Sequence, residues 1–486
     1  MALTPSVILL VVIGYFLILI AISFVTSKEA TNESFFTAKR QSPWYLVAFG
    51  MIGATLSGVT FISVPGWVGA SQFSYMQMVL GYLLGYFVIA TVLMPMYYRL
   101  NLTSIYTYLE GRFGTASYKT GAGFFLLSRI IGASFRLYLV AIVLQQFVMN
   151  AYGVPFWLTV LITIVLIWIY TYRGGIKTIV YTDTLQTFCM LLAVILTIIA
   201  VLNNVDLDIS GIASCMSEKD YSQTFFFQNG WSDKNNFFKK FLAGASIAIV
   251  MTGLDQDMMQ KNLSCKNLED AQKNMFWFSI ILVFAKFIFL LLGALLLVFA
   301  LENNIELPER TDLIFPTIAI EHLSPTVGIV FILGLIAAAY SSADSALTAL
   351  TTSFCVDFLN FEKSPDSPQK KKTRTLVHIG FSTVLFFVIL IFYFINDAAV
   401  IEQIFRVASY TYGPLLGLYS FGFMTKRPIN DLYAPIVCIL SPGITYIINK
   451  YSEILFWGYK FDFELLILNG LITFIGLWII SNKRKV

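Results

Sequence analysis

The stretch GMIGATLSGVTFISVPGW, residues 50–67, sets glycines and hydroxyl residues inside an apolar run. Glycine weakens a helix and proline removes a backbone donor, so this stretch can unwind and turn carbonyl oxygens toward a cavity. The alternative is an intact helix whose small residues allow close packing against a neighbour. The spacing favours neither structure over the other.

The rest of the chain has the composition of a polytopic membrane protein. Of its 486 residues 57% are hydrophobic and only 12% are charged, about half of the roughly one quarter typical of soluble proteins. Apolar runs of the length that crosses a bilayer recur along the chain. The five cysteines have no paired spacing and are interpreted as buried apolar residues. The apolar N-terminus has no basic leader and is expected to be a retained first span.

Hydropathy predicts thirteen membrane helices in a single domain covering residues 1–486. With the N-terminus outside, the cytoplasmic connections carry 21 Lys and Arg residues and the outer connections carry seven. This bias predicts an outer N-terminus and a cytoplasmic C-terminus in the cell (inner) membrane. The helices are expected near residues 6–26, 44–70, 74–98, 116–149, 155–170, 178–201, 240–263, 274–301, 326–358, 375–396, 401–424, 431–449 and 463–481.

A second polar cluster lies in GASIAIVMTGLDQDMMQKNL, residues 244–263, where Asp255, Gln256 and Asp257 follow Gly253. Polar groups at bilayer depth are costly unless they line a cavity or bind something. The alternative is that the helix ends early and leaves these residues solvated at the membrane surface.

A third cluster lies in AAAYSSADSALTAL, residues 337–350. Helical spacing brings the carbonyl of Ala338 and the hydroxyls of Ser341 and Ser342 to one side, and Asp344 and Ser345 extend this polar stripe. Hard cations are bound by clusters of oxygen atoms. A cation site and a serine-lined packing seam both remain open from the spacing.

Five motif-bearing stretches follow one another along the chain: SFFTAKRQSPW (34–44), SIYTYLEGRFG (104–114), YTYRGGIKTIVYTDTLQ (170–186), DQDMMQKNLSCKNLEDAQK (255–273) and SYTYGPLLGLYSFG (409–422). Together they resemble the sodium:solute symporter family, which includes sodium/glucose, sodium/proline and sodium/sialic acid cotransporters. The resemblance implies an all-α, leucine-transporter-type fold with two five-helix repeats, 44–201 and 240–424, inverted relative to each other. One extra helix (1–43) precedes the repeats and two (425–486) follow them. The first helix of each repeat is expected to be broken near the substrate site.

The same resemblance implies a site for sodium, the co-transported ion. Its ligands would be the carbonyls of Gly53, Leu56 and Ala338 and the hydroxyls of Ser341 and Ser342.

Three further residues are candidates for handling the ion. Asp183 matches a family acid linked to sodium release or to a second ion. Asp344 and Ser345 stand where some sialic acid members bind a second sodium ion, although Asp344 can instead pair with a buried cation.

The expected function is sodium-coupled import of a small polar solute by alternating access. The Asp-Gln pair suggests a hydroxyl-rich ligand, whereas residues 80–90 lack the polar residues of sugar carriers. Arg136 suits a carboxylate, or pairs internally with an acid, and Arg129 competes with it for the family position. The candidate solute ligands are Thr55, Ser57, Thr60, Arg136, Asp255, Gln256 and Lys286.

The favoured solute is a sugar, a polyol or a sugar acid. Sodium/amino acid symport, sodium/monocarboxylate symport and a sodium-independent carrier of the same fold are the alternatives. An enzyme is not expected, because the two histidines, His322 and His378, have no catalytic partners in the sequence. The expected partners are the solute, sodium and the lipid bilayer, with no nucleic acid and no obligate protein partner.

Overall fold

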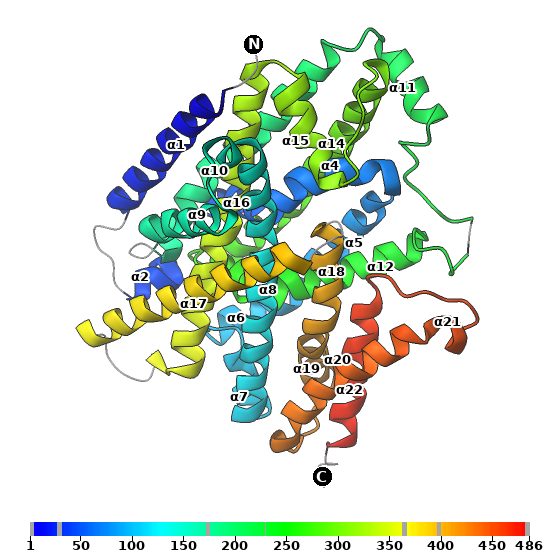
Figure 1. Ribbon diagram of the computed structural model, residues 1–486. Helices are drawn as coiled ribbons and strands as arrows, with labels where there is room; N and C mark the ends of the chain where they lie inside the picture. The colour runs from blue at the N-terminus through cyan, green and yellow to red at the C-terminus, as the bar shows by residue number, and fades with distance from the viewer. Residues whose placement is uncertain are drawn as a thin grey trace.

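The computed structural model describes residues 4–26, 32–171, 175–228, 230–361, 367–395 and 400–481. Figure 1 shows a molecule built from helices, as expected in lipid, where a helix satisfies its own backbone donors and acceptors. In the described residues, extended pairing is limited to two isolated bridges, Ser42 with Cys265 and Ile429 with Ser481.

The helices fall into two sets along the chain. The first set is α1 (Pro5–Thr26), α2 (Asn32–Thr37), α3 (Trp44–Leu56), α4 (Gly58–Ser71), α5 (Tyr75–Val88), α6 (Met94–Arg99), α7 (Thr107–Arg112), α8 (Thr115–Phe147), α9 (Phe156–Thr171), α10 (Gly175–Leu202) and α11 (Ile209–Glu218). The second set is α12 (Phe237–Ala248), α13 (Gln256–Asn262), α14 (Leu268–Glu302), α15 (Ile314–Thr317), α16 (Pro325–Ser353), α17 (Pro368–Ile395), α18 (Val400–Thr411), α19 (Gly413–Met424), α20 (Ala434–Lys450), α21 (Ser452–Leu455) and α22 (Leu465–Ile479).

Short 3-10 or π-helical turns join or extend several of these helices. They are η1 (Ala38–Arg40), η2 (Ile89–Leu93), η3 (Met149–Tyr152), η4 (Ile249–Gly253), η5 (Thr311–Leu313), η6 (Ile318–His322), η7 (Phe354–Phe358) and η9 (Asp431–Tyr433).

Each predicted span coincides with a helix or a run of consecutive helices in the described part of the chain. Within the described ranges, eight helices are long and apolar enough to cross a membrane, and counting each of two bent pairs as one span raises this number to ten. α9 and α22 are apolar but shorter, and α18 and α19 together cover the eleventh predicted span. The number thirteen therefore stays a prediction. Residue 396 and residues 172–174 of the family-like stretch lie outside the described residues.

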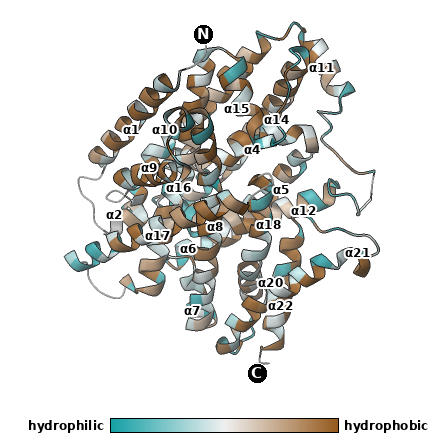
Figure 2. Ribbon diagram, viewed as in Figure 1, coloured by the Kyte–Doolittle hydropathy of each residue, from teal (hydrophilic) through white to brown (hydrophobic). Residues whose placement is uncertain are grey.

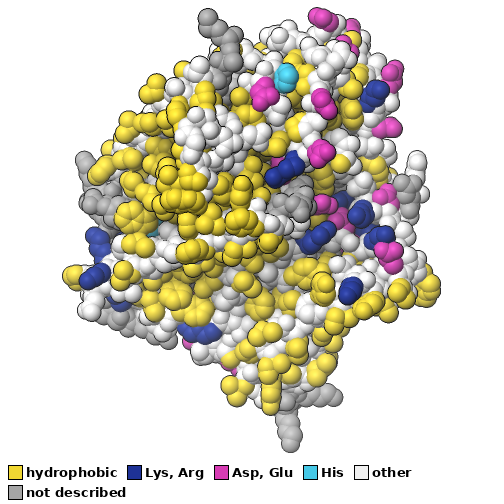
Figure 3. All heavy atoms as spheres, viewed as in Figure 1, with side chains coloured by type: hydrophobic (Ala, Val, Ile, Leu, Met, Phe, Trp, Pro, Cys, Tyr) yellow, Lys and Arg dark blue, Asp and Glu magenta, His cyan; other side chains and the backbone are white. Residues whose placement is uncertain are grey.

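The outer surface is apolar over a wide area. Large side chains such as Leu10, Phe87, Phe284 and Phe394 are more than 60% exposed. Figure 2 shows hydrophobic residues along the outer helices, and Figure 3 shows a broad hydrophobic face whose charged side chains lie mainly toward its margins. A surface of this kind is expected to contact lipid rather than water.

The first predicted break is present. α3 and α4 are separated at Ser57, whose φ of 25° and ψ of 165° are not helical, and the two helix axes differ by 53°. The intact-helix alternative is therefore wrong. Close packing occurs as well, because a Cβ on Gly53 would lie 2.1 Å from Thr187 Oγ1.

A second break divides the predicted seventh span. α12 continues through η4 to Gly253, and α13 begins at Gln256 after a bend of 69°. Asp255 caps α13, because its carboxylate accepts the backbone N–H of Asp257 at 2.9 Å. Asp255, Gln256 and Asp257 are buried, so the alternative in which they are solvated at the membrane surface is wrong.

α16 runs unbroken through the middle of the molecule. It packs against α10, α8, α4 and α3, and Figure 1 shows it surrounded by other helices. Its polar residues Ser341, Ser342, Asp344 and Ser345 are at most 1% exposed. The hydroxyl-rich stretch thus lies in the protein interior, facing other helices and not lipid.

Candidate functional site

The broken first span meets α16 at the predicted sodium ligands. The Ser342 hydroxyl lies 3.2 Å from the carbonyl oxygen of Ala54 and 3.3 Å from that of Ala338. Gly53 and Leu56 lie on the same last turn of α3, where the Gly53 carbonyl accepts the Ser57 N–H at 3.1 Å. Residues about 290 positions apart in sequence therefore present carbonyl and hydroxyl oxygens to one another. The sequence analysis did not name Ala54, whose carbonyl is the one that Ser342 contacts.

The second predicted serine contacts the family acid. Ser341 donates its hydroxyl to Asp183 Oδ1 at 2.6 Å, and Lys261 Nζ lies 2.6 Å from Asp183 Oδ2. All three side chains are at most 2% exposed. Since the Ser341 hydrogen points to Asp183, the lone pairs of its oxygen remain available to a cation. Lys261 was not among the predicted site residues, because its partner lies 78 residues away in the sequence and leaves no local signal.

Asp344 lies on α16, one turn from Ser341. Its Oδ2 accepts the Tyr170 hydroxyl at 3.0 Å, and its Oδ1 accepts the Ser345 N–H at 2.5 Å. The ion pairs of the described residues do not include Asp344, so the alternative of pairing with a buried cation is not observed. The Thr348 hydroxyl nearby is buried without a hydrogen-bond partner.

The oxygen atoms in this region suit a hard monovalent cation. Nowhere in the described part of the chain do three His, Cys, Asp or Glu residues come together to hold a metal. Neutral carbonyl and hydroxyl oxygens are the ligands expected for an ion that must also be released.

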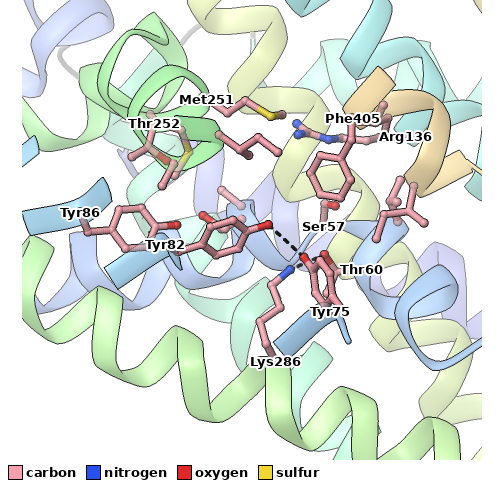
Figure 4. Close-up of a pocket in the computed structure, with 18 of the residues that line it drawn as sticks. Ser57, Thr60, Tyr75, Tyr82, Tyr86, Arg136, Met251, Thr252, Lys286 and Phe405 are labelled. Atoms are coloured by element: carbon pink, nitrogen blue, oxygen red, sulfur yellow. Dashed lines mark hydrogen bonds between the residues drawn. The ribbon is translucent and has the colours of Figure 1, made fainter. Parts of the chain in front are cut away.

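Five predicted solute ligands line one cavity next to the break. The cavity holds about 690 Å³ of unfilled space, open solvent included, and Figure 4 shows its lining. Such concave sites with a few placed polar groups are typical of ligand pockets. These five residues are Thr55, Ser57, Thr60, Arg136 and Lys286.

Two of the three cations that line this cavity have no carboxylate at ion-pair distance among the described residues. Lys286 donates to Thr60 Oγ1 at 2.9 Å and lies 5.5 Å from the centre of the Tyr75 ring. Arg136 takes part in none of the ion pairs of the described residues, and its Nε has no hydrogen-bond partner. The alternative in which Arg136 pairs internally with an acid is therefore not observed.

Arg129, the competitor of Arg136 for the family position, has internal partners instead. It pairs with Asp257, and its Nη1 lies 3.8 Å from Asp255 Oδ2. Tyr412 donates a hydrogen bond to the same Asp255 oxygen. This group connects α8 with the start of α13 and with Tyr412, which lies between α18 and α19, and Arg129 itself lines the cavity.

Asp255 and Gln256 were also predicted to bind solute, but they do not line the cavity. Asp255 caps a helix and contacts Arg129. Gln256 donates to the carbonyl of Thr103 at 2.7 Å and accepts the N–H of Ile105 at 3.0 Å. Both side chains are engaged in internal hydrogen bonds away from the cavity, so this placement gives no support to their predicted role.

The sequence analysis missed three tyrosines of α5. Tyr75, Tyr82 and Tyr86 line the cavity, and the hydroxyls of Tyr75 and Tyr82 lie 3.3 Å apart. Spacings of seven and four residues place all three on one helix face. That spacing was the available signal in the sequence. The three tyrosines supply aromatic hydroxyls to the cavity, although residues 80–90 lack the polar residues of sugar carriers.

The chain is similar to known sodium-coupled transporters. The chain is 26% identical over 419 residues to the sodium/sialic acid symporter NanT of Aliivibrio fischeri, covering 83% of this chain and 80% of that protein. It is 24% identical to the sodium/sialic acid symporter SiaT of Proteus mirabilis, covering 92% and 90%. It is 25% identical to sodium-coupled monocarboxylate transporter 1 of Mus musculus, covering 52% and 41%.

Solved structures show the fold. A substrate-bound, outward-open Na⁺-coupled sialic acid symporter matches with a TM-score of 0.84 at 22% identity, covering 98% of both chains. A nucleobase-cation-symport-1 family transporter matches with a TM-score of 0.58 at 14% identity, covering 91% and 92%. These likenesses establish the leucine-transporter-type architecture. The family model of the sodium:solute symporter family matches residues 35–431, and the chain therefore belongs to this family of transporters.

Proposed function

We propose that the protein is a sodium-coupled symporter that imports a small carboxylate-bearing solute, a sugar acid above all, by alternating access. One observation carries the proposal. The break at Ser57 meets Ser342 of α16 directly beside a cavity lined by two cations that have no carboxylate partner in the described part of the chain.

We place sodium between the end of α3 and α16. Its ligands are Gly53, Leu56, Ala338, Ser341 and Ser342, as the family resemblance implies. The two helices belong to different halves of the chain, so the ion stabilises the arrangement that brings them together. Coupling follows if sodium and solute both bind that arrangement better than the alternative one.

Asp183 is proposed to act on sodium through Ser341. Its 2.6 Å hydrogen bond fixes the direction of the serine lone pairs, and breaking that bond on the way to the inward-facing state weakens the site. Asp344 and Ser345 are the proposed place for a second sodium ion. The oxygen-rich surroundings of Asp344, with no cation paired to it in the described residues, support this assignment.

The two cations of the cavity favour an anionic solute. A buried charge without a partner is costly, and a carboxylate in the cavity offsets that cost. The hydroxyls of Thr55, Ser57 and Thr60 suit a ligand rich in oxygen. The two sialic acid relatives carry a sugar acid, which supports this class of solute.

Monocarboxylate symport is the second candidate, because the same cations fit a smaller acid and one relative is a monocarboxylate transporter. Transport draws on the sodium gradient and on the membrane potential, which contributes about 2.3 kcal/mol per charge per 100 mV. We propose a cell-membrane location with the N-terminus outside, from the distribution of Lys and Arg in the sequence.

Uptake by purified protein in liposomes tests this proposal. Labelled N-acetylneuraminate, D-gluconate, L-lactate, D-glucose and L-alanine are offered with an inward sodium gradient, and again with choline in place of sodium. We expect sodium-dependent uptake of an acid and none of glucose. Equal uptake with and without sodium would contradict sodium coupling and favour the sodium-independent alternative. Sodium-driven uptake of glucose or alanine alone would contradict the solute class.

A further inference from the structure

The segment that joins α21 to α22 lies beside the start of α12, more than 200 residues earlier in the sequence (Figure 1). Its residues 459–464, which we call the strap, contact Lys239 and Lys240, the third and fourth residues of α12. Further along, α12 lines the solute cavity with Ile247 and Ala248. The strap is therefore attached to a helix that forms one wall of the cavity.

Both lysines are buried, and each pairs with a carboxylate of the strap. Lys240 Nζ lies 2.7 Å from Asp462 Oδ2, and Lys239 Nζ lies 3.3 Å from Glu464 Oε1. Lys239 also donates a hydrogen bond to the carbonyl of Lys460 at 2.9 Å. The lysine side chains are only 1% and 5% exposed, and a buried charge is costly without a partner of opposite sign. The charges therefore hold the strap to α12 for as long as water is kept from the lysines.

Between its two carboxylates the strap carries an aromatic ring that packs next to the cavity. The ring of Phe463 lies 6.4 Å from that of Trp67 on α4 and 5.0 Å from that of Phe405 on α18. Tyr75 completes a circuit of four rings, 6.0 Å from Trp67 and 6.5 Å from Phe405. Tyr75 and Phe405 line the cavity, whereas Trp67 and Phe463 lie behind them. The four rings therefore close one end of the cavity, and Phe463 is on the side away from it.

This closed end faces outward in the proposed orientation. α4 runs from the break at Ser57 to Ser71, and Trp67 lies near its far end. With the N-terminus outside, the connection that leads into α12 is also outside. A solute that comes from outside must therefore pass the four rings to reach the cavity.

We propose that the strap is a movable outer closure of the cavity, and that solute enters after its ion pairs with Lys239 and Lys240 have parted. Water solvates these charges once the strap has moved, so the open position is accessible. The C-terminal helices beyond the expected repeats thus take part in access to the solute site. The proposal needs no particular solute and no sodium, so failure of the proposed transport activity leaves it to its own test.

The size of the effect follows from the ion pair between Lys240 and Asp462. Loss of a hydrogen bond between charged groups changes an equilibrium by about tenfold. Since the strap is closed in this structure, breaking the pair should raise the fraction of open molecules by about that factor. The access of a reagent to the cavity from outside should rise in proportion.

Labelling of a cysteine in the cavity wall tests the proposal. Ile401 of α18 lines the cavity, so Ile401→Cys places a thiol there, and the protein with this change is the parent. Intact cells that produce it are treated with a membrane-impermeant maleimide in choline medium. Peptide mass spectrometry follows labelling at position 401 separately from the native cysteines. The variants are Lys240→Met, Asp462→Asn, Phe463→Ala and the charge exchange Lys240→Asp with Asp462→Lys.

Glu453→Gln is the matched control. Glu453 pairs with Lys460 at 2.9 Å just before the strap, but both side chains are more than half exposed. An exposed pair contributes little, so this variant should be labelled at the parental rate. Thermal unfolding of each purified variant establishes that it is folded.

We expect each of the three single changes at 240, 462 and 463 to speed labelling by about tenfold. The charge exchange should return the rate toward that of the parent. Parental rates in the single variants, or an exchange labelled as fast as they are, overturn the proposal. The same comparison in inside-out vesicles checks the side, and rate differences found only there overturn the outer placement of the strap.

Discussion

Removing the Ser342 hydroxyl is the most direct test of the sodium site. In Ser342→Ala, the contacts of this hydroxyl to the carbonyls of Ala54 and Ala338, 3.2 and 3.3 Å away, are lost. Both contacts are long, so their loss should cost only about 1 kcal/mol of folding stability. The effect on sodium should be larger, because one of the five proposed ligands is gone. Loss of even an outer-shell partner costs metal sites about 10–100-fold in affinity, so the sodium concentration for half-maximal uptake should rise by at least that factor.

The measurement is initial solute uptake into proteoliposomes as a function of external sodium, at constant ionic strength. Ser382→Ala is the matched control. Like Ser342, Ser382 is buried and donates to the carbonyl four residues earlier, in its case at 2.9 Å. The control should leave the sodium dependence unchanged. The double change Ser341→Ala with Ser342→Ala should abolish sodium-dependent uptake while the protein is still produced. An unaltered sodium dependence in the double variant would refute the proposed site.

Two further changes test the packing that holds the site together. Gly53→Ala places a Cβ 2.1 Å from Thr187 Oγ1, so it should lower stability by about 1–3 kcal/mol, and Thr187→Ala in the same chain should restore part of the loss in thermal unfolding. A destabilisation that Thr187→Ala leaves untouched would argue against this contact. Lys261→Met leaves the Asp183 carboxylate buried without its cation, which should cost about 3–5 kcal/mol. Adding Asp183→Asn should recover stability, and a double variant no more stable than Lys261→Met would contradict the pairing.

The broken helices were within reach of sequence reasoning, because their cause is local. Glycines around residue 53 and the polar turn after Gly253 weaken the helix in place. Both breaks occur where expected, at Ser57 and Asp255. The spacing left open whether small residues packed closely or the helix unwound, and the structure has both. Close approaches between residues far apart in sequence, such as Gly53 and Thr187, reveal the packing.

The candidate solute site was predictable only in part. Thr55, Ser57 and Thr60 line the cavity as expected, because they flank a break that sequence can locate. Asp255 and Gln256 do not line it, since their atoms are used by the α13 cap and by backbone groups far away in sequence. Sequence spacing reports which face of a helix a residue occupies, but not which helix faces it.

The apolar composition and the repeated spans by themselves determined that this chain belongs in a membrane, and its motifs determined the family. Hydrophobicity and local backbone propensity depend on residues that are close together in the sequence, so the sequence alone reveals them. The tertiary structure alone decided which buried charges have partners. Lys261 is paired with Asp183 and Arg129 with Asp257, while Lys286 and Arg136 line the cavity with no carboxylate at ion-pair distance among the described residues. Charges in a low-dielectric interior are governed by distances across helices, and those distances exist only once the chain has folded.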